Sequence, residues 1–408
     1  MKRMNGSTSS RTSPALAYLT DIARRIEKIR ADLPRLSALG EAMAAPLLRG
    51  GEIFTPRVAA YWPSEFGGRA GGLMGVRGGD YAPTSKNDVG YFAVPRRWDD
   101  RALQALDRAT RSKAQLFVIG RPEDLPKRIK PSRFAGFTGG ASPDQGLYGT
   151  GDHRPLVSPW PFEQFVRGWI AAGEMIAACT RRGRMPILWM SVWLEGALAR
   201  NASFMRHHNL SEPWFAPLFH ERWHVPPLPG MYMGREFLAA LTQIHETLIR
   251  QSKQLAAAGA WMADAKRTSR RIWTVCVGHS YPEILELLPN CGYPLEIGPS
   301  FSSLERALPK DLKRGDVVLH LGYAPVNITH VRQILSRGLR FIHSSPYGRP
   351  DDLPDHDNFI WLDLPWRPAD ATVDLPGYSV RAMPMSSSAQ TMALFAILAE
   401  MATRMGWE

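Results

Sequence analysis

The chain has 408 residues, of which 44% are hydrophobic and 22% charged, a composition typical of a folded globular protein. This length exceeds one ordinary hydrophobic core and predicts two domains of similar size. The net charge of +12 favours an anionic partner such as a phosphorylated metabolite. The basic residues are scattered rather than clustered in blocks, which argues against nucleic acid as the partner.

Neither secretion nor membrane insertion is indicated. The Ser/Thr-rich residues 1–13 lack the apolar core of a signal peptide and are expected to form a flexible tail. No apolar run approaches the roughly 20 residues that span a bilayer. Three cysteines cannot form a disulfide framework and suit a reducing compartment, so we expect a cytoplasmic protein.

In chain order, the first half predicts alternating helices and strands. Apolar residues recur at helical spacing over 15–48 with an interruption at Pro34, which predicts two helices. Further helices are predicted at 98–111 and 161–182, and strands at 52–55, 88–94, 115–119 and 186–192. A strand, a helix and a strand at this spacing form a βαβ unit with a parallel pair of strands.

The second half repeats this plan after a connector rich in Pro, His and aromatic residues. It predicts helices at 235–266, 326–336 and 386–405, and strands at 272–277, 316–321, 339–343 and 359–362. Lys86–Phe92 aligns with Arg314–His320, and Ser112–Val118 aligns with Ser336–Ile342. We therefore expect an internal duplication, with domains at 14–201 and 235–408 joined by the connector 202–234.

The segment Trp273–Ser280 is the strongest local candidate for a ligand site. It is a short apolar run that ends at Gly278, and a helix is expected to begin near Pro282. A strand, a tight turn and a helix in this order point backbone N–H groups at an anion. Gly278, His279 and Ser280 would supply backbone, imidazole and hydroxyl groups. The alternative is an ordinary turn in which Ser280 caps the helix.

Each half resembles the SIS (sugar isomerase) domain, most closely a single-domain branch associated with phosphosugar binding. In the second half, the similar segments are Val277–Ser280, Gly315–Val318, Asn327, Asp374–Tyr378 and Pro384–Gln390. In the first half, they are Glu65–Leu73 and Ser191–Asn201. The resemblance implies an α/β fold in which a five-stranded parallel, flavodoxin-like sheet lies between helices in a three-layer sandwich. It also implies a sugar-phosphate site at the carboxyl ends of the strands, often completed across a pair of domains.

The chain departs from the family pattern in the loops that usually hold phosphate. After the second strand the family places Ser and Thr hydroxyls, whereas this chain has Gly322–Asn327 in one half and Val94–Arg97 in the other. The first half also has Thr55–Arg57 where the second has its Gly-His-Ser turn. These departures leave open a purely structural role for one module.

Three further positions are candidate ligand contacts, each with a structural alternative. Ser386, Ser387 and Ser388 precede the last helix and would bind phosphate or cap that helix. Asn327 would contact the ligand or begin a helix. Arg69 lies in a Gly-rich turn, where it would reach a phosphate or remain solvated.

Sugar isomerisation requires an acid and a base near the ligand. His279 and Glu283 are the nearest such pair in the sequence, and Glu195 is a further candidate catalytic carboxylate. A glutamate on an exposed helix surface is the alternative in each case. No complete nucleotide-binding motif is present, so no cofactor is expected.

His220-Glu221-Arg-Trp-His224 matches the zinc-peptidase motif, which requires a helix. Pro217 and Pro226 flank the motif and argue against a helix, so no metal is expected. We therefore expect a protein that binds a sugar phosphate, either as a phosphosugar isomerase or as a non-catalytic metabolite sensor. A zinc peptidase is a distant alternative. The exposed helices are compatible with a homodimer.

Overall fold

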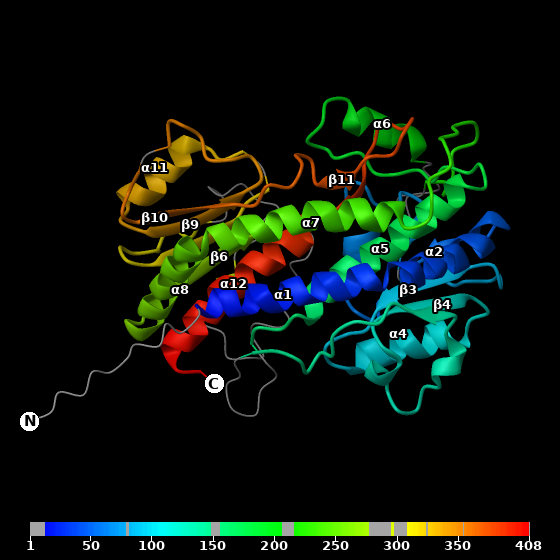
Figure 1. The fold of residues 1–408 in the computed structure, drawn as a ribbon, viewed down its shortest axis with the longest axis horizontal. Coiled ribbons are helices and arrows are strands. Elements are labelled where there is room, and N and C mark those ends of the chain that lie inside the picture. The colour runs from blue at the N-terminus through cyan, green and yellow to red at the C-terminus, as the bar shows by residue number, and fades with distance from the viewer. Residues whose placement is uncertain are drawn as a thin grey trace, which may run out of the picture.

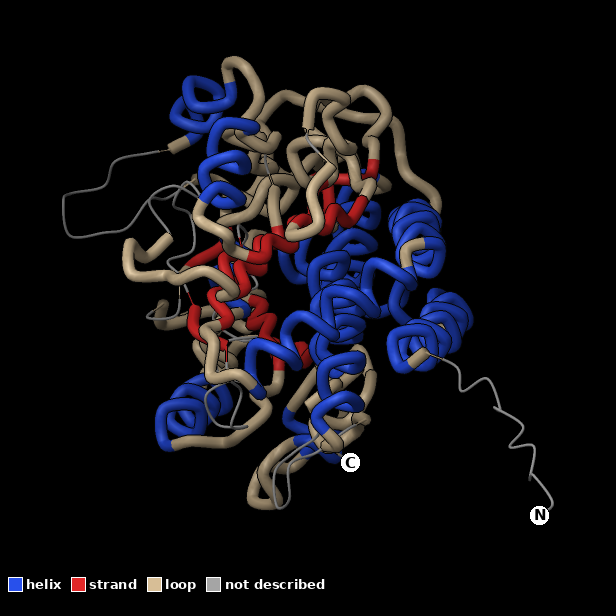
Figure 2. The backbone as a smooth tube through the Cα atoms, turned by 90° about the vertical axis from the view of Figure 1, so that its left-hand side faces the viewer, coloured by secondary structure: helices blue, strands red, loops and turns tan. Residues whose placement is uncertain are grey.

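The computed structural model describes residues 13–78, 81–147, 156–205, 216–276, 295–297, 308–323, 325–353 and 355–407. It contains two five-stranded parallel sheets, each flanked by helices (Figures 1 and 2). This arrangement confirms the predicted α/β class and the tandem three-layer sandwiches. None of the described helices is long and apolar enough to cross a membrane.

Both sheets have the same strand order. The first sheet contains β1 (Ile53–Phe54), β2 (Val76–Arg77), β3 (Val89–Ala93), β4 (Gln115–Ile119) and β5 (Gly136–Phe137). The second contains β6 (Ile272–Cys276), β7 (Leu295–Ile297), β8 (Val317–Leu321), β9 (Arg340–Ser345) and β10 (Phe359–Asp363). Numbered along the chain, each sheet runs 2-1-3-4-5, the flavodoxin-like order. In such sheets the ligand site lies where the order reverses, between the first and third strands.

Ten α-helices surround the sheets in the described part of the chain. They are α1 (Pro14–Ala31), α2 (Leu33–Leu48), α3 (Trp62–Gly67), α4 (Asp100–Arg111), α5 (Trp160–Thr180), α6 (Ala197–Phe204), α7 (Tyr232–Arg250), α8 (Ser252–Arg267), α11 (Ile328–Ser336) and α12 (Ser386–Met405). Every residue of α5 is buried, and α12 is buried from Ser386 to Ala402. These two helices are buried on all sides and therefore lie at the centre of the molecule.

The first helix of each half packs on the long buried helix of the other half. α1 packs on α12, and α7 packs on α5, whereas α2 and α8 pack on α5 and α12 respectively (Figure 1). Glu174 accepts hydrogen bonds from the backbone nitrogens of Met231 (2.7 Å) and Gly234 (3.0 Å) at the start of α7. Glu400 accepts one from the backbone nitrogen of Ala15 (3.1 Å) at the start of α1. A buried carboxylate of one half thus accepts hydrogen bonds from free backbone N–H groups at the start of α1 or α7, the first helix of the other half.

Glycine allows the close packing around these two glutamates. Gly40 of α2 and Gly259 of α8 hold the same position in their helices, as Glu174 and Glu400 do in α5 and α12. A Cβ atom on Gly40 would lie 2.6 Å from the backbone of Glu174, and one on Gly259 would lie 2.3 Å from the Glu400 Cβ. The two halves therefore share buried contacts at matching positions. The domain limits at 201 and 235 stay a prediction.

Two predicted elements were wrong. Residues 186–192 form no strand of a sheet; Pro186 and Leu188 make only isolated bridges, to Phe219 and Leu73. The predicted helix 235–266 is two helices that meet at Gln251. The Gln251 side chain bonds to the Asp363 carbonyl (2.9 Å) and accepts from the Asp363 backbone nitrogen (2.7 Å). This contact fixes the turn that sends α7 to one half and α8 to the other.

The alignment of the two halves needs one correction. Gln115 pairs with Val89, and Arg340 pairs with Val317. Gln115 therefore corresponds to Arg340, and the predicted alignment of 112–118 with 336–342 is displaced by one residue. Several short strands were missed by the sequence reasoning, namely β2, β5, β7 and the antiparallel pair β11 (Ala371–Val373) and β12 (Ala382–Pro384). Their two or three residues are too few to show a periodic pattern.

Candidate functional site

The switch point of the second sheet lies between β6 and β8. The predicted ligand residues Gly278, His279 and Ser280, and the candidate base Glu283, lie outside the described residues. Their roles therefore stay predictions. The described part of this edge is formed by the ends of β8 and β9, the start of α12, and a loop at 191–196 from the first half.

Arg69 lies in a buried ionic cluster that joins the two halves. Its guanidinium bonds to Glu65 of α3 (2.6 Å) and to Asp370, which precedes β11. It also bonds to the hydroxyls of Ser386 and Ser387 on α12. All five side chains are at most 1% exposed. Burial alone would lower the pKa of Arg69, but the Asp370 and Glu65 carboxylates outweigh burial and raise it.

This cluster fills the place where a phosphate would sit at the start of α12. Asp370 Oδ1 accepts hydrogen bonds from the backbone nitrogens of Met385 (3.1 Å) and Ser386 (2.8 Å). The anion at this helix N-terminus is therefore a carboxylate of the chain itself. Ser387 also donates to Glu65. Ligand contact by Ser386, Ser387, Ser388 or Arg69 stays a prediction, and the geometry shows Arg69 in a structural position.

A loop of the first half reaches the carboxyl end of β8. The ring of Trp193 lies 6.3 Å from the ring of Tyr323, which follows β8. Trp193 is 57% exposed, and Glu195 in the same loop is exposed. The candidate base Glu195 thus belongs to a segment next to the switch point. Asn327 is exposed and caps α11 by accepting from the His330 backbone nitrogen (3.3 Å).

Two histidines that the sequence reasoning missed face each other near this edge. His320 on β8 is in register with His343 on β9, and their Nδ1 atoms are 2.7 Å apart. His320 is 8% exposed and His343 is fully buried. Burial lowers the pKa of His320 to about 4, and burial together with His320 lowers the pKa of His343 well below its ordinary value. We refer to His320 and His343 as the histidine pair. In the sequence, these two residues are visible only as one histidine in each of two apolar strands.

Several buried polar atoms on β6, β8, β9 and α12 lack partners within the described chain. They are Nε2 of His320, Nε2 of His343, Oγ of Ser344, Oγ1 of Thr274 and, on α12, Oγ of Ser388. Buried polar atoms are nearly always hydrogen-bonded in native proteins. Side chains alternate between the two faces of a strand, so the His320 and His343 rings lie on one face of the second sheet, whereas Thr274 and Ser344 lie on the other. The two imidazole Nε2 atoms therefore mark their face of β8 and β9 as a place for polar contacts beyond those described.

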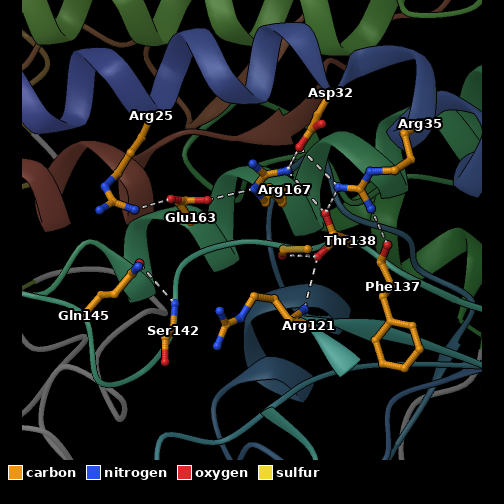
Figure 3. A network of polar contacts seen from close by, with 12 residues as sticks. Arg25, Asp32, Arg35, Arg121, Phe137, Thr138, Ser142, Gln145, Glu163 and Arg167 are labelled. Carbon is orange, nitrogen blue, oxygen red and sulfur yellow. Dashed lines mark hydrogen bonds and ion pairs between the residues drawn. The ribbon is translucent and has the colours of Figure 1, made fainter. Parts of the chain in front are cut away.

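In the first sheet, ion pairs lie at the carboxyl end of the outer strand β5 (Figure 3). Arg167 bonds to Asp32 (2.6 Å) and Glu163 (2.9 Å), and Arg25 bonds to Glu163 (2.6 Å). Arg35 and Arg167 both donate to the carbonyl oxygen at the end of β5, that of Thr138. Burial alone would raise the pKa of Asp32, but its contacts with Arg167 and Arg35 lower it. The guanidinium groups of these arginines are thus already bonded to carboxylates and backbone oxygens of the chain.

The residues of the zinc-peptidase motif do not lie on a helix. His220 Nε2 contacts the Tyr378 hydroxyl (2.9 Å), whereas His224 Nδ1 contacts the Gly183 carbonyl oxygen (2.9 Å). The two imidazoles are therefore bonded in different directions, and the zinc-peptidase alternative lacks its helix. A groove of about 410 Å³ between α1 and α7 is lined in part by Ile26 and His245, and no candidate residue borders it.

Among known proteins, similarity to this chain was found in solved structures and not at the level of sequence. No protein-family model and no curated protein matches the sequence. The C-terminal domain of glucosamine-fructose-6-phosphate aminotransferase from Francisella tularensis aligns over 99% of both chains, with 10% identity and a TM-score of 0.48. A candidate phosphosugar isomerase from Silicibacter pomeroyi aligns over 97% of this chain and 99% of its own, with 12% identity and a TM-score of 0.47.

A candidate sugar-binding protein from Salmonella typhimurium aligns over 96% of this chain and 98% of its own, with 12% identity and a TM-score of 0.46. Because identities are low and each TM-score is below 0.5, the functional argument rests on the site itself.

Proposed function

We propose that the protein binds a phosphorylated sugar at the carboxyl edge of its second sheet. One observation carries this proposal: the buried atoms His320 Nε2 and His343 Nε2 lack partners within the described chain, and they lie on one face of the neighbouring strands β8 and β9, beside the switch point. Polar atoms in such a position favour a ligand with several hydroxyl groups.

The phosphate group is supported by the sequence. The net charge of +12 favours an anionic ligand. Gly278, His279 and Ser280 follow β6 in the sequence, and we propose that they lie at the same edge and hold the phosphate. The first half would be structural, because it has Thr55–Arg57 where the second half has its Gly-His-Ser turn, and because Arg167 is already paired with Asp32 and Glu163.

We also propose that the two halves arose by duplication. Gly40 and Gly259 hold the same position in α2 and α8, and Glu174 and Glu400 hold the same position in α5 and α12. Each glycine packs against the corresponding glutamate. Chance alone would rarely reproduce this pair of contacts. A cytoplasmic location and a homodimer remain parts of the proposal, testable by cell fractionation and light scattering.

A non-catalytic sensor of the same ligand is the second candidate. It is favoured by the hydroxyls of Ser386 and Ser387, which are engaged by Arg69 and Glu65 rather than directed at a ligand. The enzyme candidate requires a base, for which Glu195, His279 and Glu283 are proposed. Interconversion of an aldose and a ketose phosphate by the purified protein would decide between the two candidates.

The direct test is thermal stability against hexose, hexosamine, pentose and N-acetylated sugar phosphates, with inorganic phosphate and the free sugars as controls. A ligand present at about 100 times its Kd adds roughly 2.7 kcal/mol to the free energy of unfolding. We expect a shift in Tm with one class of sugar phosphate and a smaller shift with inorganic phosphate. If no sugar phosphate shifts the Tm, the proposed function is wrong.

A further inference from the structure

The histidine pair has a property that a single imidazole lacks. At a separation of 2.7 Å, the two Nδ1 atoms share one hydrogen, so one ring donates and the other accepts. In the neutral pair the rings are therefore opposite tautomers. The Nε2 of the donating ring carries no hydrogen, and the Nε2 of the accepting ring carries one. Besides its internal hydrogen bond, the pair thus has one Nε2 atom that can accept a hydrogen bond and one Nε2–H group that can donate one.

The position of Gly322 places one of these rings at the strand ends. Gly322 directly follows β8, and a Cβ atom on this residue would lie 2.9 Å from Cε1 and 3.4 Å from Nε2 of His343. The Gly322 backbone therefore packs close to this imidazole, and a side chain at this position would collide with the ring and with the Ser344 carbonyl oxygen (2.5 Å). His320 lies two residues before Gly322 on the same strand, beside Val275 of β6. The pair thus adjoins the switch point between β6 and β8.

The surroundings of the pair are aromatic. Trp361 of β10 lies 4.8 Å from the ring of His343, and Phe341 lies 5.6 Å from it. The indole N–H of Trp361 is directed to Asp363 (2.7 Å) and not to the pair. An uncharged donor and acceptor in such surroundings suit an uncharged polar ligand group better than a phosphate, which prefers charged or backbone N–H donors.

We propose that the histidine pair binds the hydroxyl-bearing part of the sugar, with one Nε2 donating to a carbonyl or hydroxyl oxygen and the other accepting from a hydroxyl. This inference rests on the proposed function and names the ligand groups that these residues contact. Because the tautomers are coupled, donor and acceptor exchange when two hydrogens move: the shared hydrogen passes from one Nδ1 to the other, and the ring that receives it gives up its Nε2 hydrogen while the Nε2 of the other ring gains one from the ligand or solvent. The pair therefore accommodates a carbonyl beside a hydroxyl in either order, as in an open-chain aldose or ketose.

The test compares the affinity for sugar phosphates with that for inorganic phosphate. Glucose 6-phosphate, glucosamine 6-phosphate and N-acetylglucosamine 6-phosphate are titrated calorimetrically into the wild type, His320→Gln and His343→Gln. Loss of one neutral hydrogen bond weakens binding by about tenfold. We expect this loss for the sugar phosphate that binds, and an unchanged Kd for inorganic phosphate. His245→Gln is the control, because this buried histidine bonds to the Leu19 carbonyl oxygen (2.7 Å) on α1.

The outcomes separate the two proposals. If the wild type binds none of the three sugar phosphates, the proposed function is refuted. If the wild type binds one and both folded variants bind it equally well, the role of the histidine pair is refuted alone. Nitrogen-15 NMR of the free protein adds a test without ligand: opposite tautomers at His320 and His343 support the inference, and identical tautomers overturn it. Two variants are used so that a folding defect in one leaves the other measurable.

Discussion

Replacement of Arg69 by Met should destabilise the protein strongly, because it leaves two buried carboxylates without their cation. The Arg69 guanidinium is fully buried and bonds to Glu65 and Asp370, which are at most 1% exposed. Removal of one partner from a buried ion pair costs about 3–5 kcal/mol. Because Arg69 serves two carboxylates, we expect a loss near the upper limit, about 4–5 kcal/mol in the free energy of unfolding.

The assay is urea unfolding followed by circular dichroism and tryptophan fluorescence. Arg24→Met is the matched control, since the Arg24 side chain is 69% exposed and lies 4.0 Å from Asp21. An exposed pair of this kind contributes at most about 1 kcal/mol. We therefore expect a large decrease in the urea midpoint for Arg69→Met and a small one for Arg24→Met.

A triple variant tests the cause of the loss. Glu65→Gln and Asp370→Asn keep their hydrogen-bond acceptors for Trp169 and for the start of α12, but they remove the uncompensated charges. Added to Arg69→Met, they should recover most of the lost stability, because a neutral replacement of a whole buried ion cluster costs little. The reasoning is refuted if Arg69→Met loses less than about 1 kcal/mol, or if the triple variant is less stable than the single one.

Three further predictions follow from the packing and from the histidine pair. Gly40→Ala and Gly259→Ala should each lower the free energy of unfolding by about 1–3 kcal/mol through overpacking, whereas Gly78→Ala, with open space around it, should change it by less than about 0.5 kcal/mol in the same urea assay. Glu174→Ala should cost about 1.5–3 kcal/mol and increase hydrogen exchange at the start of α7; unchanged exchange would contradict its capping role. Since the pKa of His320 falls from 6.5 to about 4 on folding, the unfolded chain binds more protons in that interval. The contribution of neutral His320 to the free energy of unfolding is therefore complete above pH 6.5 and is lost as the pH falls towards 4. An NMR titration in which His320 of the folded protein gains its proton near pH 6.5 would contradict this.

The central strands and the closing helices could be predicted from the sequence. The runs at 88–94, 115–119 and 316–321 are apolar and bounded by Gly, Pro or Asp, and each contains an observed strand. Strands buried on both faces show such runs because no residue in them meets water. The helices at 161–182 and 386–405 could also be predicted, since long runs rich in Ala, Leu, Ile, Met and aromatic residues without an internal break favour a buried helix.

The candidate site was predicted only in part, because its contacts join distant segments. Arg69 in a Gly-rich turn suggested a phosphate contact, and only its approach to Asp370 and Ser386 shows that its charge is used inside the protein. His320 and His343 carry no motif, and their pairing depends on the register of two strands.

The sequence by itself determined the alternation of helices and strands, since hydrophobic periodicity is a local property of the chain. The tertiary structure alone decided which surfaces those elements share. It divided the helix predicted at 235–266 at Gln251 and placed α1 and α7 on opposite halves. It also brought a neutral histidine pair to the edge of the second sheet. These contacts depend on distances between residues far apart in the chain, and local periodicity carries no information about such distances.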